Sequence, residues 1–156
     1  MRFWDSSALV PLFVREERSP LVDALVEEDP AMVVWWASPV ECGSAAHRLR
    51  REGVFPLAEA AQLLTGLAAA IEAADVVVPG DEVCARALGL LAVHPLRAAD
   101  ALQLAAALLW CRGRTAGRDF VCMDGRLRTA ALLEGFTVLP AAASSSSREE
   151  TPRLTT

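Results

Sequence analysis

Four acidic residues of this sequence stand at junctions between predicted strands and the helices that follow them. Asp5 and Asp124 each follow a short apolar run directly, and Asp124 stands where a helix is expected to begin. Glu41 and Asp100 lie in the first turns of predicted helices. In a parallel α/β sheet, the carboxyl ends of the strands and the starts of the following helices meet at one edge, where ligands bind. Ordinary connectivity therefore predicts that these four carboxylates lie together.

Carboxylates gathered in this way need a positive counter-charge, because like charges within a few ångströms repel one another strongly. Two divalent cations would neutralise four such groups. Hard oxygen ligands favour Mg²⁺, for which Mn²⁺ can substitute, and sites of this kind act on phosphate esters. We therefore interpret Asp5, Glu41, Asp100 and Asp124 as catalytic residues and metal ligands.

Each acid also has a structural interpretation. An Asp is a good N-cap, and an acid in the first turn of a helix interacts favourably with the helix dipole. Ser38, Pro39 and Glu41 have the pattern of a capping box with Pro at the first helical position. Because Ser, Thr or Asn would cap as well without a charge, four acids in one setting favour the metal site.

The elements that would position these acids alternate between short apolar runs and longer amphipathic stretches, which is typical of an α/β domain with a mainly parallel sheet. Strands are expected at 2–4, 32–37, 76–78, 120–123 and 137–139. Helices are expected at 7–15, 19–28, 38–52, 56–74, 81–93, 97–111 and 124–133. In the second strand, Trp35 and Trp36 are expected to point into two buried faces.

Two further acids occupy comparable positions and are excluded from the cluster. Asp81 begins a helix after the third strand and would reach the same edge only if that strand were central. Asp119 precedes the fourth strand, so it belongs at the opposite edge of the sheet.

Length and composition indicate one folded domain. The chain has 156 residues, of which 53% are hydrophobic and 22% charged, which indicates a globular protein. The uncharged apolar run at 101–111 is too short to span a membrane, and the chain begins without an apolar signal region. We therefore expect a soluble, cytoplasmic protein with a domain at 1–140. The Ala-, Ser- and Thr-rich segment 141–156 predicts a disordered tail.

The net charge of −5 is unusual for a protein that binds nucleic acid. All 15 basic residues are arginine, which suits phosphate binding, and bound cations would reverse the charge of an acidic site. Four cysteines without a CxxC pair favour buried thiols over a zinc site or disulfides. These are Cys42, Cys84, Cys111 and Cys122. His47 and His94 are expected to serve at the surface or as caps.

Four segments of the chain resemble, in order, the motifs of PIN domains. FWDSSALV at 3–10 resembles their opening, and SPVE at 38–41 resembles their second acidic element. LRAADALQLA at 96–105 is the closest match and carries the third acid, and FVCMDGRL at 120–127 resembles the fourth. The resemblance extends from residue 1 to about residue 139, and the size is similar to that of the VapC-like branch, the toxins of type II toxin–antitoxin pairs.

The resemblance implies a PIN-like three-layer sandwich, with a five-stranded, mainly parallel sheet of order 3-2-1-4-5 flanked by helices. That order would place the strands before Asp5 and Asp124 side by side and Asp81 far away. It also implies an endoribonuclease that needs Mg²⁺ or Mn²⁺, in which the four acids bind metal directly or through water and Ser7 supplies a supporting hydroxyl. A metal-activated water would then attack an RNA phosphodiester in line.

The implied partners are the RNA substrate, a cognate antitoxin and a second copy of the chain. A homodimer is also expected because the helices at 57–74 and 98–109 have more apolar surface than one small sheet covers. The arginines considered for RNA contact are Arg15, Arg48, Arg51, Arg97 and Arg126.

Two other functions fit parts of the pattern. The alternative is a catalytically silent PIN-like module that only binds a protein partner, against which the four intact acids argue. A phosphatase is disfavoured because the chain lacks a Gly-rich phosphate loop. The residue two positions after Asp5 is Ser7 rather than a second Asp, which argues against an aspartyl-phosphate mechanism.

Overall fold

The computed structural model describes residues 1–14, 17–54 and 56–141. Arg15 and the part of the predicted tail at 142–156 lie outside these residues.

Five short strands form one parallel sheet in the order β3-β2-β1-β4-β5, as predicted. They are β1 (Arg2–Trp4), β2 (Met32–Trp35), β3 (Asp75–Val77), β4 (Asp119–Val121) and β5 (Thr137–Leu139). The central strand β1 pairs with β2 on one side and β4 on the other, so that Phe3 lies opposite both Val33 and Phe120. The sheet order therefore reverses at β1, and the loops after β1 and β4 open beside each other.

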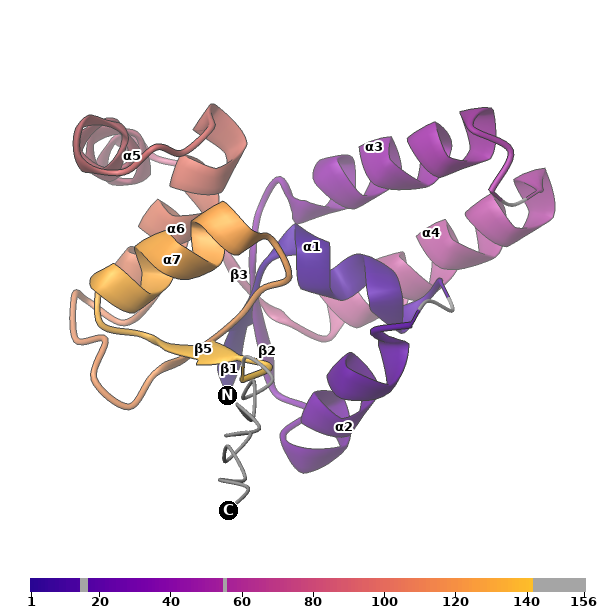
Figure 1. The fold of residues 1–156 in the computed structure, drawn as a ribbon, viewed down its shortest axis with the longest axis horizontal. Coiled ribbons are helices and arrows are strands. Elements are labelled where there is room, and N and C mark those ends of the chain that lie inside the picture. Colours follow the sequence, from indigo (N-terminus) through magenta and orange to yellow (C-terminus); the bar gives the residue numbers. More distant parts are fainter. Residues whose placement is uncertain (15–16, 55, 142–156) are drawn as a thin grey trace, which may run out of the picture.

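Helices cover both faces of this sheet and give the expected three-layer sandwich. They are α1 (Ser6–Leu9), the 3₁₀ turn η1 (Val10–Leu12), α2 (Ser19–Glu28), α3 (Ser38–Arg51), α4 (Leu57–Glu72), α5 (Asp81–Val93), α6 (Ala98–Trp110) and α7 (Gly125–Leu133). Figure 1 shows α1 to α4 on one side of the sheet and α5 to α7 on the other. Within the described residues, no helix combines the length and hydropathy that crossing a membrane requires.

Each helical layer shares its own core with the sheet, because successive side chains of a strand point to opposite faces. Phe3 lies in the core under α5 to α7, where its ring stacks on that of Phe120 with centroids 5.4 Å apart. Its neighbour Trp4 lies in the core under α1 to α4. Both are fully buried, which holds the strand ends in fixed positions.

The first predicted helix, at 7–15, is wrong in extent. The α-helix ends at Leu9, and Pro11 lies in the 3₁₀ turn that follows. Proline has no N–H to donate and its ring clashes with the preceding turn, so an α-helix does not continue through it. The chain thereby turns away just after Asp5 and Ser7.

Two expectations about burial are also wrong. The strand β2 ends at Trp35, which is buried, whereas Trp36 is 56% exposed and lies edge-on to the ring of Trp35. Side chains alternate between the two faces of a sheet only within a strand. Because β2 ends at Trp35, the side chain of Trp36 does not enter the opposite face. All four cysteines are free, but Cys84 on α5 is exposed while the other three are buried.

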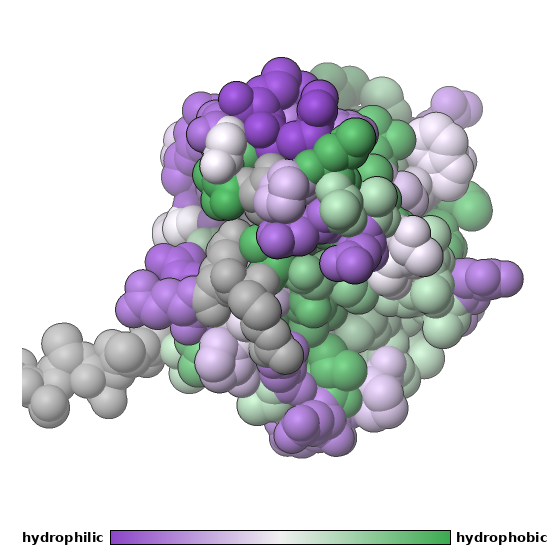
Figure 2. All heavy atoms as spheres, turned by 90° about the vertical axis from the view of Figure 1, so that its right-hand side faces the viewer, coloured by the Kyte–Doolittle hydropathy of each residue, from purple (hydrophilic) through white to green (hydrophobic). Residues whose placement is uncertain are grey.

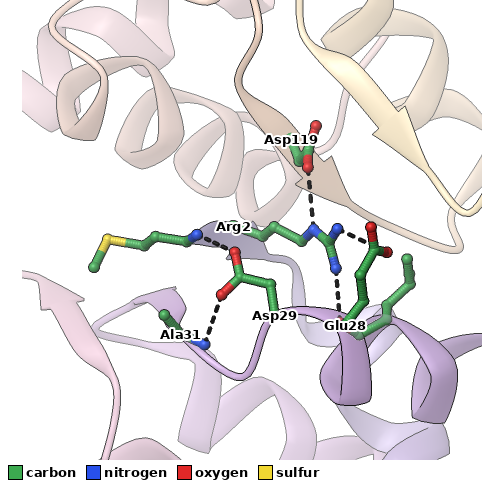
Figure 3. A network of polar contacts seen from close by, with 7 residues as sticks. Arg2, Glu28, Asp29, Ala31 and Asp119 are labelled. Atoms are coloured by element: carbon green, nitrogen blue, oxygen red, sulfur yellow. Dashed lines mark hydrogen bonds and ion pairs between the residues drawn. The ribbon is translucent and has the colours of Figure 1, made fainter.

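A network of charged side chains lies at the amino ends of β1 and β4 (Figure 3). Arg2 is buried, and its guanidinium donates to Asp119 at 3.0 Å and to the backbone carbonyl of Leu25 at 2.7 Å. It also pairs with Glu28 at 2.9 Å. Asp119 thus lies at the opposite edge from Asp5, as predicted, and is engaged in structure.

The helix α6 is the central helix of its layer. The buried residues of α6 are Ala101, Gln103 and the run from Leu104 to Leu108. The richness of 98–109 in Ala and Leu therefore serves the core of one chain and is not evidence for a second copy. Large apolar side chains are exposed elsewhere, on α5 and at the end of α7. They include Leu88, Val93, Leu132 and Leu133.

Candidate active site

All four predicted acids line one cavity of about 510 Å³ at the carboxyl ends of β1 and β4. Its lining consists of Asp5, Ser6, Ser7, Val10, Pro11, Glu41, Ala45, Arg48, Leu49, Arg97, Asp100 and Asp124. The excluded acids Asp81 and Asp119 are not among these residues. The two strands are adjacent here, because the backbone N–H of Asp5 donates to the carbonyl of Val121 at 2.9 Å.

Asp5 caps α1 from a buried position. Its Oδ2 atom accepts a hydrogen bond from the backbone N–H of Ser7 at 2.9 Å and another from the Ser7 hydroxyl. Burial raises the pKa of the Asp5 carboxyl to about 6, and the negative charge of Glu41 adds to this rise, while the bonds from Ser7 oppose it. Asp5 therefore carries a negative charge that the protein stabilises poorly.

Ser7 joins the two loops that carry Asp5 and Asp124. Its hydroxyl oxygen accepts hydrogen bonds from the backbone N–H groups of Met123 at 2.9 Å and Asp124 at 3.2 Å, and the hydroxyl donates to Asp5. The thiol of Cys122 lies 3.6 Å from both the Ser7 hydroxyl and Asp5 Oδ2. These hydrogen bonds place the Ser7 hydroxyl beside Asp5, where it supports the carboxylate.

Asp124 and Asp100 each hold a helix start while facing the cavity. Asp124 caps α7, since its Oδ1 atom accepts from the backbone N–H groups of Arg126 at 2.9 Å and Leu127 at 3.0 Å. Asp100 accepts from the backbone N–H of Arg97 at 3.1 Å through Oδ2. These bonds use one oxygen of each carboxylate. The structural and the chemical interpretations of these acids are therefore compatible.

The capping box predicted for Ser38 and Glu41 is wrong. The N-cap of α3 is Ala37, so Ser38 lies one residue inside the helix, fully buried, and no side-chain bond caps this end. Glu41 instead accepts a hydrogen bond from Gln103 of α6, at 3.0 Å. Burial raises the pKa of Glu41, the bonds from Gln103 and Ser6 lower it, and the charge of Asp100 raises it.

Gln103 contacts Glu41 but was not among the predicted site residues. It is 1% exposed and lies one turn after Asp100 on the same helix. In the sequence, Gln103 is the one amide within a run of Ala and Leu at 101–109, which could have indicated a role in the site. Its partners could not be identified, because they come from α1 and α3.

Oxygen donors dominate the cavity, and this donor set suits Mg²⁺ or Mn²⁺. Among the described residues, however, no three His, Cys, Asp or Glu side chains are gathered closely enough to hold a metal ion. Four carboxylates around one cavity fit a hydrated cation, of the kind that keeps several waters and takes one or two carboxylates directly. The histidines lie outside this lining: His94 pairs with Glu134 at 2.7 Å, and His47 is exposed.

Two of the arginines considered for RNA contact line the cavity. Arg97 precedes α6 beside Asp100, and Arg48 projects from α3 and forms an exposed ion pair with Glu52 at 3.3 Å. Arg51 and Arg126 are not part of the lining.

Comparison with solved structures finds the same architecture in toxins. VapC20 of Mycobacterium tuberculosis, described as a Sarcin-Ricin loop cleaving toxin, has a TM-score of 0.64 at 17% identity, over 88% of this chain and 97% of that one. A chain of a toxin–antitoxin complex from Klebsiella pneumoniae has a TM-score of 0.57 at 14% identity, over 80% of this chain and 87% of that one. The chain shares its fold with these toxins.

The PIN-like, VapC-like fold inferred from four short motifs is thus confirmed, with the strand order of that prediction. The sequence itself matches no model of a protein family and no curated protein. At identities this low, the likeness to VapC20 is one of fold, and the chemistry must be argued from the cavity.

Proposed function

We propose that this protein is a Mg²⁺- or Mn²⁺-dependent endoribonuclease that acts in the cytoplasm as the toxin of a toxin–antitoxin pair. The observation that carries the proposal is the single cavity lined by four carboxylates from separate elements. It lies where the sheet order reverses, which is the usual ligand site of such folds. The shared fold with VapC20, described as a Sarcin-Ricin loop cleaving toxin, supports the choice of substrate.

In this proposal, Asp5, Glu41, Asp100 and Asp124 hold the cation directly or through water. When bound, the cation polarises a phosphate oxygen and makes water at the site more acidic. Burial, with a smaller contribution from neighbouring acids, raises the pKa values of Asp5 and Glu41, so a bound cation would stabilise their negative charges. Ser7 keeps the carboxylate of Asp5 in place through two bonds to Oδ2.

Arg48 and Arg97 bind phosphates of the RNA on either side of the cleaved bond. Both line the cavity, Arg48 from α3 and Arg97 from the residue before α6, so they can contact the substrate backbone while the carboxylates engage the reacting phosphate. A chain with a net charge of −5 has no general attraction for RNA, and such local arginines would supply it.

The antitoxin would engage the same cavity and the apolar surface beside it. Val10, Pro11, Ala45 and Leu49 form the apolar part of the lining next to the carboxylates. On the face that carries the outer ends of α3 and α4, Figure 2 shows hydrophobic residues exposed between hydrophilic ones. An inhibitor with an arginine for the carboxylates and apolar residues for this surface would displace the cation and block RNA.

A homodimer is also part of the proposal, now placed on a different surface. Val93 of α5 is exposed and lines a second cavity of about 590 Å³, which α5, Leu109 of α6 and Glu134 bound. Leu88 of α5 and Leu132 and Leu133 of α7 are exposed as well. Apolar side chains grouped at a surface favour association. Light scattering of the purified protein at micromolar concentration should give twice the mass of one chain.

The silent interaction module remains the second candidate, favoured by the lack of a compact metal cluster among the described residues. Calorimetric titration with Mn²⁺ and an RNA cleavage assay separate the two. The nuclease should bind Mn²⁺ saturably and should cut RNA in Mg²⁺ but not in EDTA. A protein that binds its antitoxin but neither binds Mn²⁺ nor cuts RNA would be the silent module.

A further inference from the structure

Gln103 connects the two helical layers at the edge of the sheet that carries the four acids. Its Nε2 atom lies 2.7 Å from the Ser6 hydroxyl, 3.0 Å from Glu41 Oε2 and 3.3 Å from the Ser38 hydroxyl. The three partners belong to α1 and α3, whereas Gln103 belongs to α6 on the other side of the sheet. Glu41 carries the only formal charge among these partners and is the strongest acceptor of the three.

Core stability alone does not account for this residue. Its neighbours on α6 are buried Ala and Leu side chains, and its Oε1 atom is buried without a hydrogen-bond partner. A buried amide oxygen left without a partner is destabilising by about 1–3 kcal/mol. An apolar side chain would fill the position without that loss, so the contacts of the Nε2 atom must explain the glutamine.

The four acids differ in how they are held. The three Asp side chains accept hydrogen bonds from backbone N–H groups at helix starts: Asp5 from Ser7, Asp100 from Arg97 and Asp124 from Arg126 and Leu127. Glu41 has one more rotatable bond than an Asp. Its hydrogen bonds come from side chains, the amide of Gln103 at 3.0 Å and the hydroxyl of Ser6. Gln103 therefore holds Glu41 both directly and through Ser6, whose hydroxyl it also contacts, whereas backbone N–H groups hold the other three acids.

We propose that Gln103 is a positioning residue that holds the Glu41 carboxylate toward the cavity and thereby sets the affinity of the site for a divalent cation. This inference rests on the proposed metal-dependent function. A partner that orients a ligand typically contributes 10- to 100-fold to metal affinity.

The test is a double-mutant cycle of Gln103→Met and Glu41→Gln, read by Mn²⁺ calorimetry and by thermal unfolding in EDTA. Met has a similar length to Gln but donates no hydrogen bond. We expect Gln103→Met to weaken Mn²⁺ binding about 10- to 100-fold in the wild-type background. In the Glu41→Gln background it should change binding less than about threefold, because the carboxylate to be oriented is gone. Thermal stability without metal should hold or rise, since the unpaired oxygen is removed.

Leu108→Ala is the matched control, because Leu108 is buried on the same helix and is not part of the cavity lining. It should lower thermal stability and leave the Kd for Mn²⁺ within about twofold. Gln103→Asn withdraws the amide by one methylene and should weaken Mn²⁺ binding as well, which keeps the test valid if Gln103→Met does not fold.

Different outcomes reject different claims. If wild type binds Mn²⁺ and Gln103→Met binds it equally well, or loses the same factor in both backgrounds, the role of Gln103 is rejected and the nuclease proposal stands. If wild type binds no Mn²⁺, the metal site is rejected and the role of Gln103 with it.

Discussion

The hydroxyl oxygen of Ser7 accepts a hydrogen bond from the backbone N–H of Asp124 at 3.2 Å, across 117 positions of sequence. The same oxygen accepts from Met123 and the hydroxyl donates to Asp5. One small side chain thus fixes the distance between two of the four acids.

Ser7→Ala removes the hydroxyl that connects the loops of Asp5 and Asp124. Because two backbone N–H groups lose their acceptor, we expect a loss of about 1–3 kcal/mol in the free energy of unfolding. RNA cleavage should fall as well. Urea unfolding and a cleavage assay measure the two effects. Ser44→Ala, on the exposed side of α3, is the control and should stay within about 0.5 kcal/mol of wild type. Equal stability of the two variants would contradict the role of Ser7.

Asp5→Asn and Asp100→Asn should each abolish Mg²⁺-dependent RNA cleavage, since each removes one negative ligand while keeping the shape. Without metal, their thermal stability should hold or rise because repulsion within the cavity is relieved. Cleavage is measured beside wild type with EDTA controls. Asp81→Asn changes an exposed acid outside the cavity and should cleave normally. Full activity in both cavity variants would reject the site.

Asp5 should make the stability of the metal-free protein depend on pH. Burial raises the pKa of its carboxyl from 3.8 to about 6, so the folded protein holds this proton more tightly than the unfolded chain. The resulting stabilisation is fully present below about pH 4 and is lost as the pH rises through about 6. In EDTA, urea unfolding of wild type should lose on the order of 3 kcal/mol over this window relative to Asp5→Asn. If the free energy of unfolding depends on pH in the same way in both proteins, this role of Asp5 is rejected.

Arg48→Ala and Arg97→Ala should weaken RNA binding at low substrate concentration more than they slow the reaction at saturation. Each variant should raise KM. Each should also lower the slope of log affinity against log salt concentration by about one, as expected for the loss of one phosphate contact. Arg51→Ala, from the same helix as Arg48 but outside the cavity lining, is the control. An Arg51 variant with the same salt slope as the other two would indicate nonspecific attraction.

Expression of this chain alone should arrest bacterial growth, and Asp5→Asn should relieve the arrest. Co-expression of a cognate antitoxin, expected from the neighbouring upstream gene, should relieve it too. Growth curves of induced wild type, mutant and co-expressed pair measure this. Harmless wild type that still cuts RNA when purified would reject the toxin but not the nuclease.

The meeting of the four acids could be predicted because it depends on local features. Asp5 and Asp124 were placed by the apolar runs before them, and both of those runs are strands at the centre of the sheet. The motifs added the order of the strands, which periodicity does not determine.

Other features depend on a single residue of register or on distant contacts. Ser38 has the sequence of a cap but lies one residue inside α3, an offset that sequence signals do not resolve. The partners of Gln103 lie 97, 65 and 62 positions away, so a buried amide could be noticed but not explained. Trp36 illustrates the same limit, because its exposure depends on where β2 stops.

The charge network around Arg2 has a consequence for the order in which the chain is made. The ribosome synthesises β1 before its neighbour β4, and the partner Asp119 follows Arg2 only 117 positions later. Until then the central strand has one open edge, and Asp5 stands apart from Asp124. If the proposed function holds, the nascent chain has no complete site until β4 and α7 have emerged, and an antitoxin made beforehand would have time to meet it.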